Sequence, residues 1–164
     1  AQQRKGLSAF IDSGCITCHK GVGLGGDTFQ KFGMVNEPYW KYTQSPKQDE
    51  GRFEVTKKED DKYFFRVPSL RNVAVTEPYM HDGSVATLEE AVAIMAGGGR
   101  NITSGPRAGD GRANPHKSPL VRDRGLSAQD RADIVAFLKT LTDETFLSDP
   151  AFSDPFRKDA ASRP

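Results

Sequence analysis

Two cysteines and a histidine fall within five residues near the start of the chain. The stretch reads Cys15-Ile16-Thr17-Cys18-His19, and Cys-x-x-Cys-His is the attachment signature of a c-type haem. The spacing lets both sulfurs reach the two vinyl groups of one porphyrin and form thioethers. The histidine then stands beneath the ring, where a neutral imidazole nitrogen can bind iron. We predict that Cys15 and Cys18 hold one haem c covalently and that His19 is its proximal ligand.

Three other uses of the cysteines compete with haem attachment, since the chain has only two of them. A disulfide would suit a thioredoxin-like redox site, but no βαβ pattern surrounds the pair. Structural zinc needs four ligands, and the spare histidines, His81 and His116, lack zinc-finger spacing. A chance match of the five residues is the third alternative. We favour haem because a candidate for the second axial ligand occurs independently further along the chain.

Size and composition limit the function classes. A length of 164 residues favours one domain. The hydrophobic fraction of 36% is low, which a haem that supplies part of the core would explain. The net charge of +1, from 23 basic and 22 acidic residues, gives no reason to expect a nucleic-acid partner. No apolar run approaches the roughly 18 residues of a membrane helix, so we expect no membrane span.

The hydrophobic pattern predicts three helices. The first covers residues 4–14, with apolar residues at i, i+3 and i+4, and leads into the haem motif. The second starts at a capping box headed by Thr87, ends at Gly97, and places Met95 in its core stripe. The third starts at Ser127. We expect the first and last helices to cross and close the fold.

A glycine-rich segment follows the haem motif. Residues 21–26 formally match G-x-G-x-x-G, but a dinucleotide site needs that motif between a strand and a helix. We therefore reject nucleotide binding and expect the glycines to let the backbone pass close to a flat ring edge. Residues 98–126 form a long, locally basic stretch without periodicity. This stretch is either a docking surface for an acidic redox partner or a solvated loop.

The second axial ligand of the iron decides the function. Met80 lies in a loop bounded by Pro78 and Gly83, where no helical core stripe explains a methionine. The alternatives are an open site or one of the other candidates: Met34, Met95, His81 and His116. We predict Met80, because Met95 is assigned to a helix core. Histidine–methionine ligation fills both axial positions, raises the reduction potential and suits electron transfer.

Two further residues are candidates for binding the haem propionates. Arg71 could pair with a propionate through its planar guanidinium, the alternative being a surface arginine. Trp40 could donate its indole N–H to a propionate, the alternative being a core tryptophan.

Longer motifs resemble a known family. They are the glycine-rich loop, Phe53-Glu54-Val55-Thr56-Lys57, Phe65-Arg66-Val67-Pro68-Ser69-Leu70-Arg71-Asn72, Thr76-Glu77-Pro78-Tyr79-Met80-His81-Asp82-Gly83 and Thr87-Leu88-Glu89-Glu90-Ala91. Together they resemble the C-terminal, electron-transferring half of bacterial di-haem cytochrome c peroxidases and their MauG-like relatives. The resemblance runs from about Gly6 to about Leu141.

The resemblance implies a mainly α, cytochrome c-like domain wrapped around one covalent haem c, with long loops. We expect the haem domain over residues 1–145 and an extended tail over 146–164. It also implies electron transfer through His19 and Met80, with no catalytic residue in this chain. The implied partners are a small cytochrome or cupredoxin as redox donor or acceptor, and a second haem domain. The implied location is the bacterial periplasm, with any signal peptide already removed or absent.

The alternative function is an open-iron haem enzyme, a peroxidase or a MauG-like oxidation catalyst, acting alone or with the missing haem domain. Only one Cys-x-x-Cys-His occurs here. The chain is therefore either a fragment of a two-haem enzyme or a stand-alone single-haem cytochrome.

Overall fold

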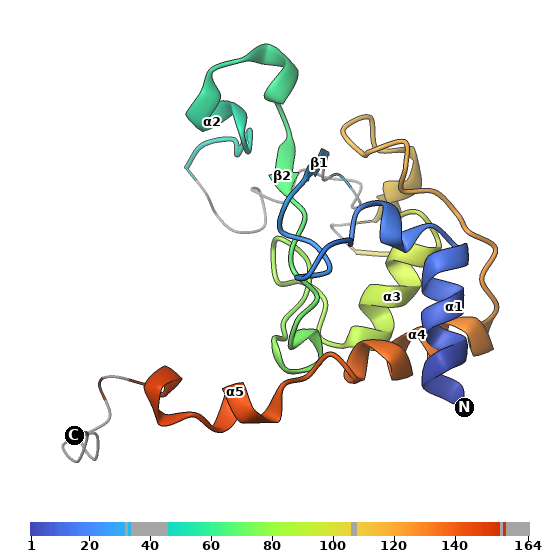
Figure 1. Ribbon diagram of the computed structural model, residues 1–164. Coiled ribbons are helices and arrows are strands. Elements are labelled where there is room, and N and C mark those ends of the chain that lie inside the picture. Colours follow the sequence, from blue (N-terminus) through green and yellow to red (C-terminus); the bar gives the residue numbers. More distant parts are fainter. Residues whose placement is uncertain (32, 34–45, 106–107, 155, 157–164) are drawn as a thin grey trace.

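Helices dominate the part of the chain that the structure describes. The computed structural model describes residues 1–31, 33, 46–105, 108–154 and 156. The three longer helices are α1 (Gln2–Asp12), α3 (Leu88–Ala96) and α4 (Ala128–Lys139). They lie together on one side of the molecule (Figure 1). The mainly α, cytochrome c-like architecture predicted from the sequence is confirmed.

Helices α1 and α4 cross, as predicted, and their contact forms the centre of the fold. A Cβ atom on Gly6 of α1 would lie 1.8 Å from the backbone oxygen of Asp133 in α4, so only glycine permits this approach. The rings of Phe10 and Phe137 pack 5.4 Å apart at the same crossing. The main core cluster is Phe10, Leu88, Val92, Ile134, Val135, Phe137 and Leu138.

Helix α3 separates this main core cluster from a smaller one. Leu88 and Val92 face the main cluster, whereas Ala91 and Ile94 pack with the fully buried Val85. Met95 was predicted in the helix core, and that prediction is wrong. Met95 is 38% exposed and joins neither cluster. The two sides of α3 that pack on the clusters carry other residues, and Met95 lies on neither of them.

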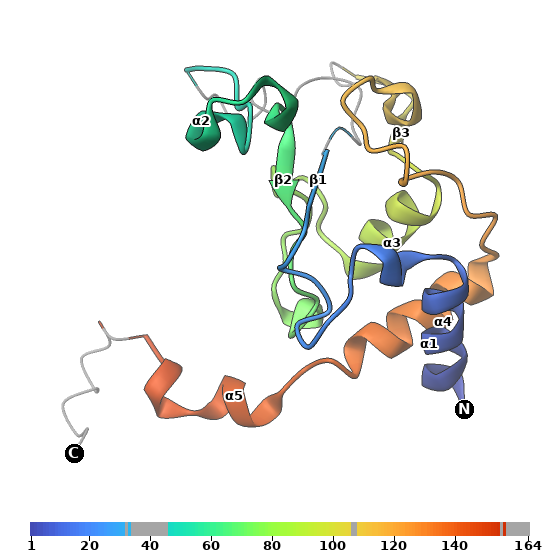
Figure 2. The same cartoon turned by 45° about the horizontal axis from the view of Figure 1, so that its top comes forward.

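Two small antiparallel sheets complete the body. Strand β1 (Phe29–Lys31) pairs with β2 (Phe64–Arg66), and β3 (Asn101–Ile102) pairs with β4 (Gly109–Asp110). The short helix α2 (Phe53–Thr56) lies above β2, away from the crossing helices (Figure 2). Strands of two or three residues are too short to show an alternating pattern, so the sequence did not indicate them.

The described part of the tail differs from the extended form that we predicted. It contains α5 (Glu144–Ser148) and a 3-10 turn (Pro150–Phe152), so the boundary expected at residue 145 falls inside a helix. The side chains of Asp143 and Asp149 cap these turns by accepting from the backbone N–H groups of Phe146 and Ala151. These caps start both turns, and Pro150 stands at the first position of the second one, where proline is compatible with a helical turn.

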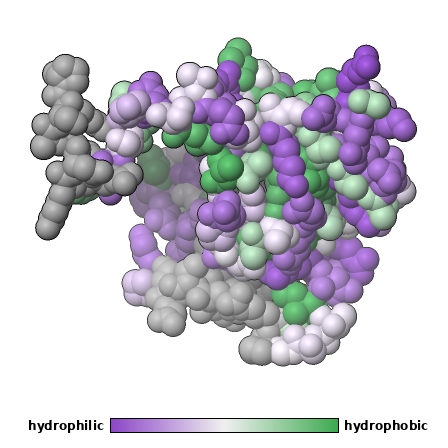
Figure 3. Space-filling view, turned by 90° about the horizontal axis from the view of Figure 1, so that it is seen from below, coloured by the Kyte–Doolittle hydropathy of each residue, from purple (hydrophilic) through white to green (hydrophobic). Residues whose placement is uncertain are grey.

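The tail stands away from the body as an arm (Figures 1 and 2). The rings of Phe146 and Phe152 stack on each other at 4.4 Å, and Phe152 remains 63% exposed. On the face seen in Figure 3, apolar residues interrupt a mainly polar surface. Within the described residues, no helix is long and apolar enough to cross a membrane.

Candidate haem site

The haem motif begins where α1 stops. Gly14 adopts a left-handed backbone conformation (φ 83°) that ends the helix, and a 3-10 turn follows over Cys15–Thr17. The turn continues to His19, whose N–H donates to the carbonyl of Cys15 at 3.0 Å. This single compact turn sets the direction of both cysteines and of the histidine, as the attachment signature requires.

His19 is held in the form that binds iron. Its Nδ1 atom lies 3.3 Å from the carbonyl oxygen of Leu24. Burial lowers the pKa of His19 below its usual value, and the backbone carbonyls of Leu24 and Pro68 oppose this shift. Burial therefore favours the neutral imidazole. The Leu24 carbonyl can only accept, so a hydrogen bond from Nδ1–H leaves the lone pair on Nε2 for a metal.

The glycine-rich segment packs around this histidine. A Cβ atom on Gly25 would lie 2.1 Å from the carbonyl oxygen of Pro68 and 3.3 Å from His19 Nδ1. The N–H of Gly26 donates to Val67 at 2.8 Å, and the Ser69 hydroxyl donates to Gly23 at 2.6 Å. The glycines thus allow the backbone of residues 23–26 to pack closely on that of residues 67–69, beside His19.

Both cysteines are free thiols in the structure. Cys15 packs against the main core cluster, and its Sγ lies 3.3 Å from the Ser13 hydroxyl. Burial raises the pKa of Cys18, while the positive charges of Arg124 and Lys20 oppose this shift. Among the described residues, no group of three His, Cys, Asp or Glu side chains is arranged to hold a metal ion.

Met80 lies at the start of a tight turn. Tyr79 and Val85 pair through N–H···O bonds of 2.7 and 3.3 Å, and the turn between them is closed by the Gly83 N–H on the Met80 carbonyl. Met80 itself has a left-handed backbone (φ 68°), which is uncommon for a non-glycine residue. Its side chain packs against the cluster of Val85, Ala91 and Ile94.

Tyr79 connects this turn to the haem motif. It packs against both core clusters, and its hydroxyl donates to the carbonyl of Val73 at 2.9 Å. Cys15 and Leu24 pack against the main cluster as well. Tyr79 therefore bridges the two clusters, with Met80 packed on the smaller one and the haem motif packed on the main one.

The two described histidines that compete with Met80 have other contacts. His81 Nε2 lies 3.2 Å from Asp49 Oδ2, and the imidazole packs on Phe65 at 4.5 Å. The ring of His116 stacks with Tyr63 at 4.0 Å. His81 is 39% exposed, so the turn directs its methionine toward the core and its histidine toward the surface.

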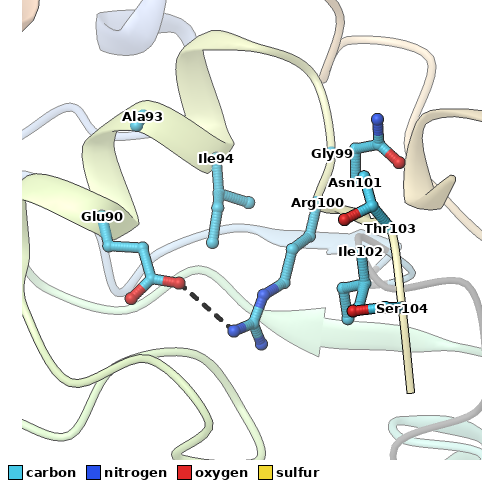
Figure 4. Close-up of a pocket in the computed structure, with 9 residues that line it drawn as sticks. All are labelled: Glu90, Ala93, Ile94, Gly99, Arg100, Asn101, Ile102, Thr103 and Ser104. Carbon is cyan, nitrogen blue, oxygen red and sulfur yellow. Dashed lines mark hydrogen bonds and ion pairs between the residues drawn. The ribbon is translucent and has the colours of Figure 1, made fainter. Parts of the chain in front are cut away.

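Arg100 makes contacts that sequence reasoning missed. One nitrogen donates to the Ser84 hydroxyl at 3.0 Å, and another pairs with Glu90 at 3.2 Å (Figure 4). Ser84 belongs to the Met80 turn and Glu90 to α3, so Arg100 links the two. It also lines an open cavity of about 470 Å³ beside α3. In the sequence, Arg100 is only one of several arginines in a basic stretch, and nothing there indicates that it pairs with Ser84 and Glu90.

The remaining candidates have different outcomes. The Nε of Arg71 donates to the carbonyl of Val22 at 3.2 Å, so this side chain lies over the glycine-rich segment. Its role at a propionate stays a prediction. Trp40 and Met34 lie outside the described residues.

The residues of the site fit a covalent haem. They supply two free thiols at the attachment spacing, an imidazole whose Nε2 is left available by the Nδ1 contact to Leu24, and a thioether on a turn that Tyr79 ties to the main core cluster. The helix crossing and this donor set define a c-type cytochrome. The sequence model of the Cytochrome c family matches residues 3–142, and the chain belongs to this family. Cytochrome c domains carry covalently bound haem c.

The proteins that this chain is similar to include bacterial cytochrome c peroxidases. The chain is 54% identical over 95 residues to the cytochrome c551 peroxidase of Pseudomonas aeruginosa, which is 58% of this chain and 27% of that protein. It is 39% identical over 138 residues to the cytochrome c551 peroxidase of Nitrosomonas europaea, which is 84% of this chain and 33% of that protein. The chain is thus homologous to bacterial cytochrome c peroxidases, and it spans about a third or less of their length.

Solved structures agree with this relationship. A MauG-like protein associated with microbial copper homeostasis superimposes with a TM-score of 0.78 at 44% identity, covering 95% of this chain and 51% of that one. The diheme peroxidase BthA from Burkholderia thailandensis gives 0.60 at 26% identity, covering 89% of this chain and 43% of that one. The predicted resemblance to peroxidases and MauG-like proteins is confirmed.

Proposed function

We propose that this chain transfers electrons through a single haem c with His19 and Met80 as axial ligands. The observation that carries the proposal is the Met80 turn. It directs the thioether toward a core cluster while His81 is paired with Asp49 at the surface. A bound haem c would supply one-electron redox chemistry.

The residues of the chain would hold and protect this group. Cys15 and Cys18 would anchor it by thioethers, and His19 would bind through Nε2 because its Nδ1–H donates a hydrogen bond to the Leu24 carbonyl. A neutral methionine and a buried neutral imidazole favour the ferrous state relative to more polar ligands, which raises the potential. With both axial positions filled, no position remains for a substrate.

The chain would correspond to the electron-transferring half of a two-haem peroxidase, in which a second haem domain meets hydrogen peroxide. Its similarity to diheme peroxidase BthA and to cytochrome c551 peroxidases, each over less than half of their length, supports this assignment. We also propose a periplasmic location, since covalent haem attachment by this motif and the peroxidase relatives both suit that compartment.

The alternative function is an open-iron enzyme with peroxidase or MauG-like oxidation activity. The similarity to a MauG-like structure at 44% identity is the observation that favours this alternative. In that case His81 would act as an acid or base on bound peroxide, which its pairing with Asp49 at the surface disfavours.

The optical spectrum of the ferric haem-loaded chain separates the two functions. A low-spin spectrum with the weak far-red band of sulfur ligation is expected, and a high-spin spectrum would support the open-iron enzyme. Met80→Ala should remove the band and lower the reduction potential, whereas the neighbouring His81→Ala should keep both. An unchanged Met80→Ala spectrum would mean that another residue binds the iron.

A further inference from the structure

The backbone of residues 70–73 is hydrogen-bonded to the segment that holds His19. The carbonyl oxygen of Leu24 lies 3.3 Å from His19 Nδ1, and the same oxygen accepts from the Leu70 N–H at 3.3 Å. The Leu70 carbonyl accepts from the Val73 N–H at 3.2 Å, which closes a turn. Leu24, Leu70 and Val73 all pack against the main core cluster, so the position of this turn is fixed relative to His19.

The same turn also holds Tyr79. The Tyr79 hydroxyl donates to the Val73 carbonyl at 2.9 Å, and Tyr79 directly precedes Met80 in the chain. The intervening residues 75–78 are exposed, so packing of these residues does not fix where the Met80 turn begins. The side chain of Tyr79 therefore ties the turn of the predicted distal ligand to the backbone that supports the predicted proximal ligand.

The backbone of Met80 needs support from its surroundings. Its left-handed conformation (φ 68°) is strained for a residue with a side chain, and such a conformation persists only where neighbouring contacts enforce it. After Met80, the turn is held by the Gly83 N–H, which donates to the Met80 carbonyl at 3.2 Å, and by the fully buried Val85. Before Met80, it is held by the Tyr79 hydroxyl. Loss of that hydroxyl would release one of the two ends.

We propose that Tyr79 is a positioning residue for the axial methionine. Its hydroxyl holds the start of the Met80 turn at a fixed place relative to the His19 segment, so that the thioether stays on the iron and external ligands are excluded. The inference rests on the proposed function, because it takes Met80 as the axial ligand. It goes further by assigning to one hydroxyl group the difference between a firmly closed electron-transfer site and an iron that opens to small molecules.

Tyr79→Phe removes this hydroxyl and little else. The phenylalanine ring would keep the apolar contacts with both core clusters. The Val73 carbonyl would keep a second donor, the Thr76 hydroxyl at 3.3 Å, so this acceptor is not left without a partner. The variant should therefore fold, and its effect should be confined to the Met80 turn.

The test measures the binding of imidazole to the ferric, haem-loaded chain by stopped-flow. Imidazole can bind only after the Met80 sulfur has left the iron, and the iron keeps its oxidation state in this exchange. The observed rate should therefore reach a limit at high imidazole concentration, and this limit reports the loss of the sulfur. Tyr79→Phe should raise the limiting rate about 2- to 10-fold, which is the change expected from one hydrogen bond. Equilibrium binding of imidazole should become tighter by a similar factor.

Two variants control for other effects. Thr76→Val removes the other hydroxyl that donates to the Val73 carbonyl but leaves the Tyr79 bond in place, so its limiting rate should match that of the wild type. Ser127→Ala removes the side-chain cap of α4 and lowers the general stability of the fold. It should also leave the limiting rate unchanged, because the cap is not part of the Met80 turn.

An unchanged limiting rate in Tyr79→Phe would overturn the inference. An equal acceleration in Thr76→Val or Ser127→Ala would overturn it as well, because the Tyr79 hydroxyl would then have no specific effect on Met80. A wild-type chain whose imidazole-binding rate rises without a limit, and which Met80→Ala does not alter, would instead refute Met80 as the ligand and with it the proposed function. The two failures are therefore distinguishable.

Discussion

Gly6 of α1 lies directly against the backbone of Asp133 in α4. A Cβ atom on Gly6 would lie 1.8 Å from the Asp133 backbone oxygen and 2.9 Å from the Cβ atom of Phe137. Neither atom can move without shifting α4. The crossing that supports the haem motif therefore depends on a residue with no side chain.

Gly6→Ala should destabilise the fold. In an exposed helix this change is favourable by about 1 kcal/mol, but here the added methyl group should cost about 1–3 kcal/mol or more through overpacking. Denaturant unfolding of the haem-loaded chain measures the difference. Ser8→Ala, at an exposed position of the same helix, is the control and should have little effect. A stabilised Gly6→Ala variant would contradict the close crossing.

Arg100→Gln should loosen the Met80 turn. The variant loses the ion pair with Glu90 and weakens the bond to Ser84. If Met80 binds the iron, the far-red sulfur band should then disappear at a lower temperature than in the wild type, and Arg100→Lys should restore part of the difference. The matched control is Arg112→Gln, because Arg112 pairs with Asp110 only two residues away. Equal band loss in both glutamine variants would argue against the link.

The cap of α4 should respond to pH. Ser127 and Asp130 form a reciprocal capping box, and the Ser127 hydrogen bonds hold the pKa of Asp130 below its ordinary value of 3.8. A carboxyl with a lowered pKa in the folded state stabilises the fold above its unfolded pKa, and this contribution is lost as the pH falls through the folded pKa.

Ser127→Ala should therefore cost about 1 kcal/mol at pH 7 and progressively less below about pH 4. Urea unfolding at several pH values measures the difference between the variant and the wild type. A difference that stays constant from pH 7 to pH 3 would show that the Asp130 carboxylate does not contribute to the cap.

Removal of residues 149–164 should leave the body intact. The described part of this segment is exposed, and its aromatic contact is the stack between Phe146 and Phe152 within the tail. The unfolding midpoint should change by no more than about 1–2 °C, because removing this segment uncovers little apolar surface of the body. Asn72→Ala is an informative comparison, since the Asn72 side chain accepts from the Asp143 N–H at 2.7 Å. A large loss on truncation would show that the tail packs on the body.

Much of this protein could be predicted from short stretches of its sequence. The haem signature, the helix caps at Thr87 and Ser127, and the apolar spacing before Gly14 each depend on residues within one or two turns of chain. Both N-caps and the helices that they start are confirmed, but of these two caps only Ser127 forms a reciprocal capping box, because the Glu90 carboxylate pairs with Arg100 instead. The same reasoning failed for Met95, because helix periodicity cannot tell which side of α3 meets another element.

The tertiary structure decided which residues act together over long separations. It joined Gly6 to Asp133, paired His81 with Asp49, linked Arg100 to Ser84, and gave Cys15 a core environment but Cys18 a charged surface. These relationships depend on close packing and on charge between distant segments, which no local pattern encodes. The amino-acid sequence by itself determined where the haem attachment motif lies, whereas the folded chain determined what surrounds each of its two cysteines.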